Sequence, residues 1–301
     1  MIEVKNLVKR YGGFIAVNHI SFDAHPGEIV GLLGPNGAGK TTTMRILTGY
    51  MPPTSGEVKV AGFDVLNDSM AARQRVGYLP ERVPLYPDMS VEAYVLYWAR
   101  LRRTPNARQR TQQVLEQFNL LDRRKKLVRS LSKGLRQRLG LAQAIVHDPP
   151  VLILDEPTIG IDPKQVVEVR EVIRNLKTQR TILFSSHILS EVEQLCDRVV
   201  ILDKGRVVGA GTREILSQQL QAEVKFYVAV NADVDHVHQL LLELPGVINV
   251  SSEGPGFVIT AADETIRQHI MSAITINQLD LLELRPIDTR LEDIFMQRVE
   301  S

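Results

Sequence analysis

The chain has 301 residues, with 36 Lys and Arg against 35 Asp and Glu, 44% hydrophobic and 24% charged residues. This length suits one large or two moderate domains, and the composition is that of an ordinary globular protein, which excludes collagen, coiled coils and disordered chains. No segment approaches the ~18 uncharged apolar residues of a membrane helix, and the N-terminus lacks the apolar core of a secretion signal, so we expect neither. Cys196 is the only cysteine, which excludes an intrachain disulfide and fits a reducing cytosol.

From the start to about Val208, short β-branched runs alternate with longer helical stretches, which predicts a mainly parallel sheet covered by helices. The clearest buried strands are Ile29–Leu33, Val151–Leu154, Thr181–Phe184 and Arg198–Leu202. Ser90–Leu101 and Arg108–Leu121 show helical spacing with no strand between them. We therefore expect a helical subdomain over about residues 84–145, inside an α/β domain that spans 1–215.

Charge is distributed unevenly within this domain. Thirteen Lys and Arg side chains lie between Arg100 and Arg138 with only Glu116 and Asp122, so the segment has a local charge of +11 in a chain of net charge +1. Such a block is typical of a solvated helical face, and it also suits contact with anionic lipid, a nucleotide or another chain.

After Gly211 the pattern changes to a strand–helix–strand–strand–helix–strand order, which predicts a small ferredoxin-like α+β domain over residues 216–301. The expected elements are Val224–Val230, Val234–Leu244, two strands around Ser251–Gly256, Thr265–Thr275 and Leu281–Arg285. An amphipathic segment, Thr289–Val299, would pack on this domain or on a partner. No His, Cys or carboxylate set has metal-ligand spacing here, so we do not expect a metal sensor.

The segment Gly34–Thr41 matches G-x-x-x-x-G-K-[ST] and lies between an apolar strand and a helical run. Its glycines let backbone N–H groups turn inward around an anion, and the helix that follows points its positive end at the same place. In such a loop Lys40 reaches the β and γ phosphates and Thr41 binds Mg²⁺. The segment therefore predicts a nucleotide-binding P-loop.

A second apolar strand ends in two neighbouring carboxylates, Asp155 and Glu156. Adjacent residues of an extended chain point to opposite sides, so the two cannot share one task. We expect Asp155 to face the Mg²⁺ held by Thr41, and Glu156 to face the water that attacks the γ-phosphate, as base or as orienter.

With further motifs, about the first 215 residues resemble the ATP-binding cassette (ABC) ATPase family. Tyr11 is similar to the family's adenine-stacking aromatic residue. Leu131–Gly134, reading LSKG, resembles the family signature LSGGQ, Ile159–Asp162 matches the D-loop, and His187 matches the switch histidine.

The resemblance implies an ATPase in which two copies, or one copy and a paralogue, enclose two ATP molecules, with Mg²⁺ as cofactor. Catalysis would involve Lys40, Glu156 and His187, and the metal would be held by Thr41, Asp155 and Glu81. ATP would contact residues of one chain and, across the dimer, the signature and D-loop of the other: Tyr11, Gly34, Pro35, Asn36, Gly37, Ala38, Gly39, Lys40, Thr41 and Thr42, then Ser132, Gly134 and Asp162.

The sequence departs from the family pattern at two motifs. The signature has Lys133 and Leu135 in place of glycine and glutamine, and Glu81 ends the Q-loop, where a glutamine is usual. A glutamate there can still accept a hydrogen bond from metal-bound water, and it should respond to pH as an amide would not. Together with the C-terminal extension near Leu291–Phe295, both variants resemble the subgroup that serves type-2 exporters, including those associated with gliding motility.

Since the chain itself has no predicted membrane helix, the resemblance implies a separate membrane subunit docked around Glu81–Tyr97, and a place on the cytoplasmic face of the membrane.

An alternative is a non-transport ABC ATPase of DNA repair, chromosome maintenance or translation. Those relatives typically carry two cassettes, coiled coils or zinc insertions, which are absent, so we expect no nucleic-acid partner. A P-loop kinase or GTPase would leave the signature and D-loop unexplained.

Overall fold

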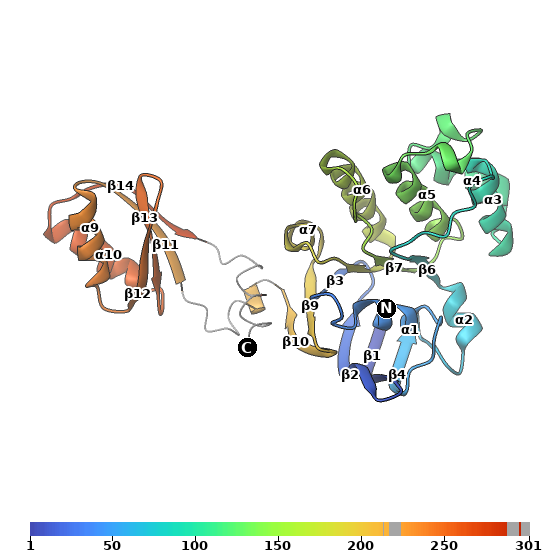
Figure 1. Ribbon diagram of the computed structural model, residues 1–301, viewed down its shortest axis with the longest axis horizontal. Helices are drawn as coiled ribbons and strands as arrows, with labels where there is room; N and C mark the ends of the chain where they lie inside the picture. The colour runs from blue at the N-terminus through green and yellow to red at the C-terminus, as the bar shows by residue number, and fades with distance from the viewer. Residues whose placement is uncertain (213, 217–223, 288–294, 296–301) are drawn as a thin grey trace. The chain divides into compact units, whose positions relative to one another are not determined.

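The computed structural model describes residues 1–212, 214–216, 224–287 and 295 (Figure 1). By its internal contacts the chain divides into two units, Met1–Thr212 and Arg213–Ser301, whereas the sequence places the boundary between 215 and 216. The predicted segment Thr289–Val299 lies, apart from position 295, outside the described residues. No helix in the described part is both long and apolar enough to cross a bilayer.

The first unit contains a six-stranded sheet of order β10-β9-β3-β8-β7-β6. Its strands are β3 (Ile29–Leu33), β6 (Val76–Leu79), β7 (Val151–Asp155), β8 (Thr181–Ser185), β9 (Arg198–Asp203) and β10 (Arg206–Gly211). All neighbours are parallel except β9 and β10. Every residue of β3, β7 and β8 is buried, as expected of strands covered on both faces. The predicted parallel sheet is confirmed.

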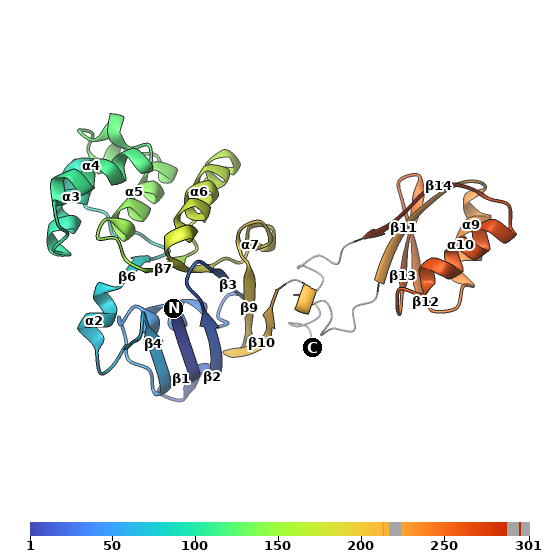
Figure 2. The same cartoon turned by 180° about the vertical axis from the view of Figure 1, so that it is seen from behind.

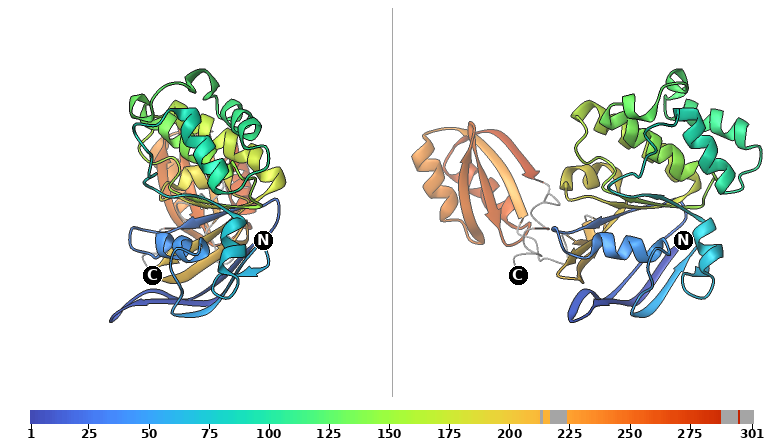
Figure 3. Two further views of the ribbon diagram at one scale, coloured as in Figure 1. Left: turned by 90° about the vertical axis from the view of Figure 1, so that its right-hand side faces the viewer. Right: turned by 45° about the vertical axis from the view of Figure 1, so that its right-hand side comes forward.

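An antiparallel four-stranded sheet, of order β2-β1-β4-β5, was not predicted. It consists of β1 (Ile2–Tyr11), β2 (Phe14–Ala24), β4 (Ser55–Val60) and β5 (Phe63–Asp64). Register shifts between β1 and β2 break the alternation of buried and exposed residues that identifies such strands in a sequence. Helix α1 (Lys40–Leu47) lies between the two sheets (Figure 3), and its Met44 and Leu47 share one apolar core with Ile2 and Leu32.

Three helices, α3 (Val91–Leu101), α4 (Ala107–Gln117) and α5 (Lys133–Ile145), form the helical part of this unit (Figures 1 and 2). Ser90 caps α3, because its Oγ accepts a hydrogen bond from the Ala93 N–H at 3.2 Å. Helix α4 ends four residues before the predicted Leu121, since Asn119 has the left-handed φ of +54° that terminates helices. The remaining elements of the unit are α2 (Ser69–Gln74), α6 (Pro163–Leu176), α7 (Leu189–Leu195) and three short 3₁₀ turns, Leu121–Arg123, Val128–Ser130 and Lys177–Gln179.

The basic block does not form one free surface. Arg138 pairs with Glu168 of α6, and Arg129 with Asp88 at 3.0 Å. Arg110 reaches Asp148, at 3.4 Å, before β7. The pairs of Arg138 and Arg110 connect the helical part to the rest of the unit, whereas the pair of Arg129 lies within it. The exposed basic residues include a consecutive run: Arg123, Arg124, Lys125 and Lys126.

The second unit has the predicted βαββαβ order: β11 (Val224–Asn231), α9 (Val234–Leu242), β12 (Val247–Glu253), β13 (Gly256–Ala261), α10 (Ile266–Ile276) and β14 (Asp280–Ile287). Its antiparallel sheet has the order β12-β13-β11-β14, which places the first and third strands in the centre. One core joins this sheet to both helices through residues such as Val228, Leu241, Ile259 and Ile270. The ferredoxin-like prediction is confirmed.

Replacing Ile259, which is fully buried in this core, tests the packing of the second unit. Ile259→Ala removes methyl groups from a filled interior, and we expect it to lower the free energy of unfolding by about 2–5 kcal/mol. Urea unfolding followed by circular dichroism measures the change. Ile248→Ala on β12, where the side chain is 54% exposed, is the control and should cost less than about 0.5 kcal/mol. Equal costs would contradict the assigned register.

Candidate functional site

The predicted functional side chains follow neighbouring parallel strands. The loop 34–40 follows β3, Asp155 and Glu156 end β7, His187 follows β8, and Glu81 follows β6. Because these strands are adjacent and parallel, their carboxyl ends lie at one edge of the sheet. The order of the strands therefore brings together residues that are far apart in the sequence.

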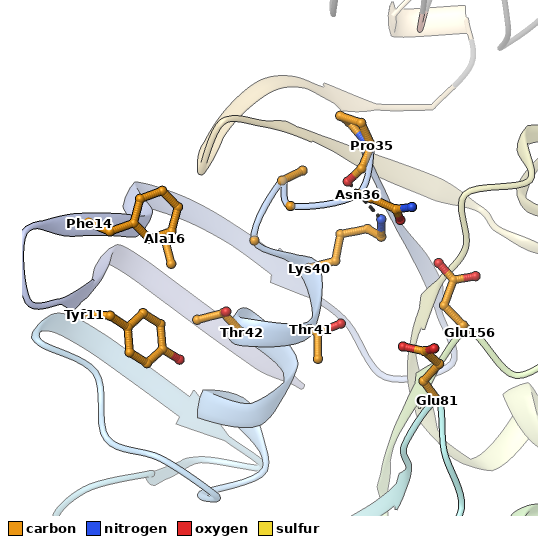
Figure 4. Close-up of a pocket in the computed structure, with 13 residues that line it drawn as sticks. Tyr11, Phe14, Ala16, Pro35, Asn36, Lys40, Thr41, Thr42, Glu81 and Glu156 are labelled. Atoms are coloured by element: carbon orange, nitrogen blue, oxygen red, sulfur yellow. Dashed lines mark hydrogen bonds between the residues drawn. The ribbon is translucent and has the colours of Figure 1, made fainter.

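An open pocket of about 270 Å³ lies at this edge (Figure 4). The loop Pro35–Thr42 forms its floor, and Glu81 and Glu156 lie on the side opposite the aromatic residues Tyr11 and Phe14. Of the predicted ATP contacts within one chain, only Gly34 is missing from the lining. Phe14 and Ala16 line the pocket without having been predicted.

The aromatic side of the pocket is built by a hairpin. A two-residue turn, in which Gly12 has a φ of +57°, joins β1 to β2 and pairs Tyr11 with Phe14 across the strands. Tyr11 is 46% and Phe14 64% exposed. The Tyr11 hydroxyl donates to the Met51 Sδ at 3.0 Å, which orients the ring. Two accessible aromatic surfaces suit stacking with a flat base.

The P-loop needs its glycines. Gly37 and Gly39 have φ values of +85° and +103°, which favour glycine. A side chain at Gly39 would also come within 2.7 Å of the Ala16 carbonyl. The Lys40 ammonium donates hydrogen bonds to the carbonyls of Gly34 at 2.6 Å and Pro35 at 3.3 Å. The lysine therefore lies folded against its own loop.

Lys40 faces three carboxylates across the pocket. Burial lowers the pKa of its ammonium, while the negative charges of Glu156, Asp155 and Glu81 oppose that shift. An ammonium held in this position offers a positive charge to phosphate groups that enter between it and the acidic wall.

Asp155 is 1% exposed, and its side chain is hydrogen-bonded to Ser185. Ser185 Oγ donates to its Oδ1 at 2.8 Å and accepts from the Glu156 N–H at 3.0 Å. Burial raises the pKa of the Asp155 carboxyl, and Glu81 adds to the shift, while the hydroxyls of Ser185 and Thr41 and the charge of Lys40 oppose it.

The second oxygen of Asp155, Oδ2, is buried without a hydrogen-bond partner. A buried carboxylate oxygen is a costly group to leave unpaired, and a cation would satisfy it. Within the described residues no group of three or more His, Cys, Asp or Glu could hold a metal alone. This arrangement fits Mg²⁺, which usually binds one or two carboxylates together with substrate phosphates.

Glu156 and His187 form a hydrogen-bonded pair. His187 Nδ1 lies 2.8 Å from Glu156 Oε2, and the glutamate is 7% exposed. Glu156 has a φ of +49°, a left-handed conformation that is costly for a residue with a side chain. The two candidate catalytic side chains therefore lie side by side, at a strained position next to the pocket.

Ser132, Gly134 and Asp162 form a separate group that does not line the pocket. Ser132 caps α5 and Asp162 caps α6, where its Oδ1 accepts from the Gln165 N–H at 3.0 Å. Gly134 packs so closely on the Gln165 side chain that any larger residue would collide with it.

Comparison with known proteins places this site in a family. The family model described as "ABC transporter" matches residues 17–159. The linearmycin resistance ATP-binding protein of Bacillus subtilis is 32% identical, over 98% of this chain and 97% of its own length. The Nod factor export ATP-binding protein I of Burkholderia orbicola is 40% identical, over 71% and 72% of the two chains. A solved ATP-binding subunit of an ABC transporter superposes with a TM-score of 0.68 at 32% identity, covering 73% of this chain and 93% of that one.

The fold and the pocket define a P-loop ATPase. The chain belongs to the family of ABC transporter ATP-binding proteins, and it is an ATP-hydrolysing subunit.

Asp155→Asn tests the electrostatics of the site. The folded-state pKa of Asp155 lies above the unfolded value of about 3.8, so the ionised carboxylate costs stability at neutral pH, and this cost disappears as the pH falls below that value. We expect Asp155→Asn to raise the melting temperature of the nucleotide-free protein at pH 7, and the gain to shrink as the pH falls.

Thermal unfolding between pH 8 and pH 5, with and without Mg²⁺ and ATP, measures both effects. The variant should lose the extra stabilisation that Mg²⁺ adds to ATP. A lower melting temperature at pH 7, with the Mg²⁺ effect retained, would contradict the assignment.

Proposed function

We propose that this chain is the energy-supplying subunit of an exporter, in which two copies, or one copy and a paralogue, enclose two molecules of ATP with Mg²⁺. The observation that carries the proposal is the convergence of the P-loop, the unpaired Asp155 oxygen and the Glu156–His187 pair at one edge of the sheet. The export role rests on the names of the relatives, one of which is a Nod factor export protein.

ATP binding follows from the geometry of the pocket. Tyr11 and Phe14 offer surfaces for the adenine ring, and the inward N–H groups of the loop 35–42, with the N-terminus of α1, attract the phosphates. Lys40 would exchange its two carbonyl partners for phosphate oxygens. Thr41 and Asp155 would hold Mg²⁺, with Glu81 next to it, and the metal would neutralise charge on the phosphates.

Hydrolysis requires a water molecule aligned with the γ-phosphate. Glu156 lies at the pocket wall and can accept a proton from that water or orient it. His187, bonded to Glu156 through Nδ1, fixes the direction of the carboxylate and leaves its other ring nitrogen for the phosphate. Preparation of the attacking water thus depends on Glu156 and His187, whereas binding of ATP depends on the P-loop.

The second copy completes each site. Ser132 and Gly134 stand at the start of α5, where a helix offers N–H groups to an anion, but they lie outside the pocket of their own chain. They could act only on ATP held by the opposite subunit. Asp162, which starts α6, would face the same interface.

A membrane subunit has a suitable docking surface on this unit. A groove of about 640 Å³ lies between the end of α1, helix α2 and helix α3, and Tyr50, Met70 and Leu101 line it with exposed fractions of 74%, 64% and 56%. Strand β6 runs along it through Tyr78 and continues to Glu81 in the nucleotide pocket. A partner in the groove would therefore act on the pocket through one short strand, on the cytoplasmic face of the membrane.

Glu156→Gln separates binding from hydrolysis. The variant keeps the P-loop and the metal ligands but no longer prepares the water, so we expect turnover to fall by about 10²–10⁴-fold with little change in ATP affinity. Light scattering behind a sizing column should show its mass doubling with ATP and Mg²⁺. Near-normal turnover would show that another group activates the water.

Two control variants separate the steps. Lys40→Ala should lose ATP binding itself. Ser132→Arg, added to Glu156→Gln, should bind ATP without doubling its mass, because the arginine would occupy the place of the opposite γ-phosphate. Doubling that survives Ser132→Arg would contradict the shared site.

Leu101→Asp tests the docking groove. An aspartate among the aromatic and aliphatic residues of this lining, which also contains Arg73, Arg102 and Arg103, should release the chain from membranes that contain its partner, while ATP turnover of the purified chain stays within about twofold of wild type. Fractionation of cells that make both subunits measures the membrane-bound share. Leu66→Asp, at a side chain 50% exposed outside the groove, is the matched control. Equal membrane association of the two variants would exclude this groove.

A further inference from the structure

The loops that follow β7 and β8 are joined at three successive points. Ser185 bridges the side chain of Asp155 and the backbone of Glu156, and Glu156 pairs with His187. The third connection uses a residue of helix α7, Glu191, to which neither the motifs nor the proposed function assigns a task.

Glu191 is a buried carboxylate, 4% exposed, in the first turn of α7. Its Oε2 accepts a hydrogen bond from Thr158 Oγ1 at 2.5 Å and another from Ser186 Oγ at 3.1 Å. Thr158 is 3% exposed and Ser186 is fully buried, so water does not compete for these bonds. One oxygen atom therefore holds both loops.

The bridge is tied to the backbone of the second loop. Ser186 Oγ also accepts a hydrogen bond from the Ile188 N–H at 3.0 Å, which fixes the turn that carries His187. Thr158 stands two residues after Glu156, and Ser186 stands one residue before His187. Each candidate catalytic residue thus lies within two positions of a residue of the bridge.

This placement bears on the strained backbone at Glu156. A left-handed φ at a residue other than glycine costs free energy, and contacts with the surrounding structure must offset that cost. Ser185 holds the Glu156 N–H on one side, and the bond from Thr158 to Glu191 fixes the chain on the other. Without the hydrogen bond between Thr158 and Glu191, the backbone of Glu156 could relax and move its carboxylate away from His187.

We propose that Glu191 is a positioning residue for ATP hydrolysis, which through Thr158 and Ser186 keeps Glu156 and His187 in the geometry that prepares the water; this role rests on the proposed function. Thr158 also precedes the segment Ile159–Asp162, which would face the second copy. The bridge then lies next to that interface segment, and closure of the dimer would act on Glu156 through it as well as through the hydrogen bond from the Ile159 N–H to the Glu156 carbonyl at 3.2 Å.

A matched pair of variants at Thr158 tests the bridge in the full-length protein. Thr158→Val keeps the shape and loses the hydroxyl, whereas Thr158→Ser keeps the hydroxyl. Because a hydrogen bond to a buried carboxylate is lost, we expect Thr158→Val to lower kcat about tenfold or more with the Kd for ATP nearly unchanged; the melting temperature should fall by a few degrees, since the same bond stabilises the fold. Thr158→Ser should stay within about threefold of the wild-type kcat.

Glu191→Gln should lower kcat in the same way, and adding Thr158→Val to it should cause little further loss, because both changes break one connection. Additive losses, or a loss of ATP affinity or stability in place of kcat, would overturn the bridge. A normal kcat in both Thr158→Val and Glu191→Gln, together with an inactive Glu156→Gln, would also overturn the bridge. The assignment of the chain as an ATPase would then stand. Normal turnover in all three variants would instead overturn the assignment of Glu156 on which the bridge rests.

Discussion

Complete burial of the central strands constrains everything else in the first unit. Since β3, β7 and β8 expose no residue along their length, neither face of the sheet can carry chemistry. Reactive side chains can only emerge where these strands end. Parallel register places all of those ends at one edge, so the P-loop, the acidic pair and the histidine meet there. Burial of the strands therefore confines the nucleotide pocket to that edge, where the first turn of α1 lines it with Lys40, Thr41 and Thr42.

The same constraint produces polar groups that are only partly satisfied. Asp155 is buried deeply enough to leave Oδ2 without a partner, and Glu156 is held at a φ of +49°. Neither feature stabilises the folded protein when no ligand is bound. In the proposed function each has a use once a cation and a water molecule enter, which is the usual reason for strain and unpaired charge at a functional site.

Local patterns allowed much of the fold to be predicted. Strands such as Ile29–Leu33 read as continuous apolar runs because both of their faces are buried, and the P-loop and acidic pair follow from spacing alone. The antiparallel sheet was missed because bulges in β1 hide its alternation, and α4 ends early because of the conformation of Asn119.

The misses at the site have a different cause. Phe14 becomes a pocket residue only when a hairpin pairs it with Tyr11, and Glu191 matters only because α7 carries it to two distant loops. Such roles depend on contacts between segments far apart in the sequence. The resemblance to a family, by contrast, already assigned the Ser132 group to the nucleotide of the opposite subunit, and this group does not line the P-loop pocket.

The groove contains the residue that determines the tryptophan fluorescence of this protein. Trp98 is the only tryptophan in the chain, and it lines the groove together with Leu101 and Tyr78. It also takes part in an edge-on aromatic cluster with Tyr94 and Tyr97. The intrinsic indole emission of this protein therefore originates at a single place. This emission reports on the surface next to strand β6 and not on an average over the fold. In the proposed function, changes transmitted between the nucleotide pocket and the membrane subunit would cross this surface, so tryptophan fluorescence would detect them.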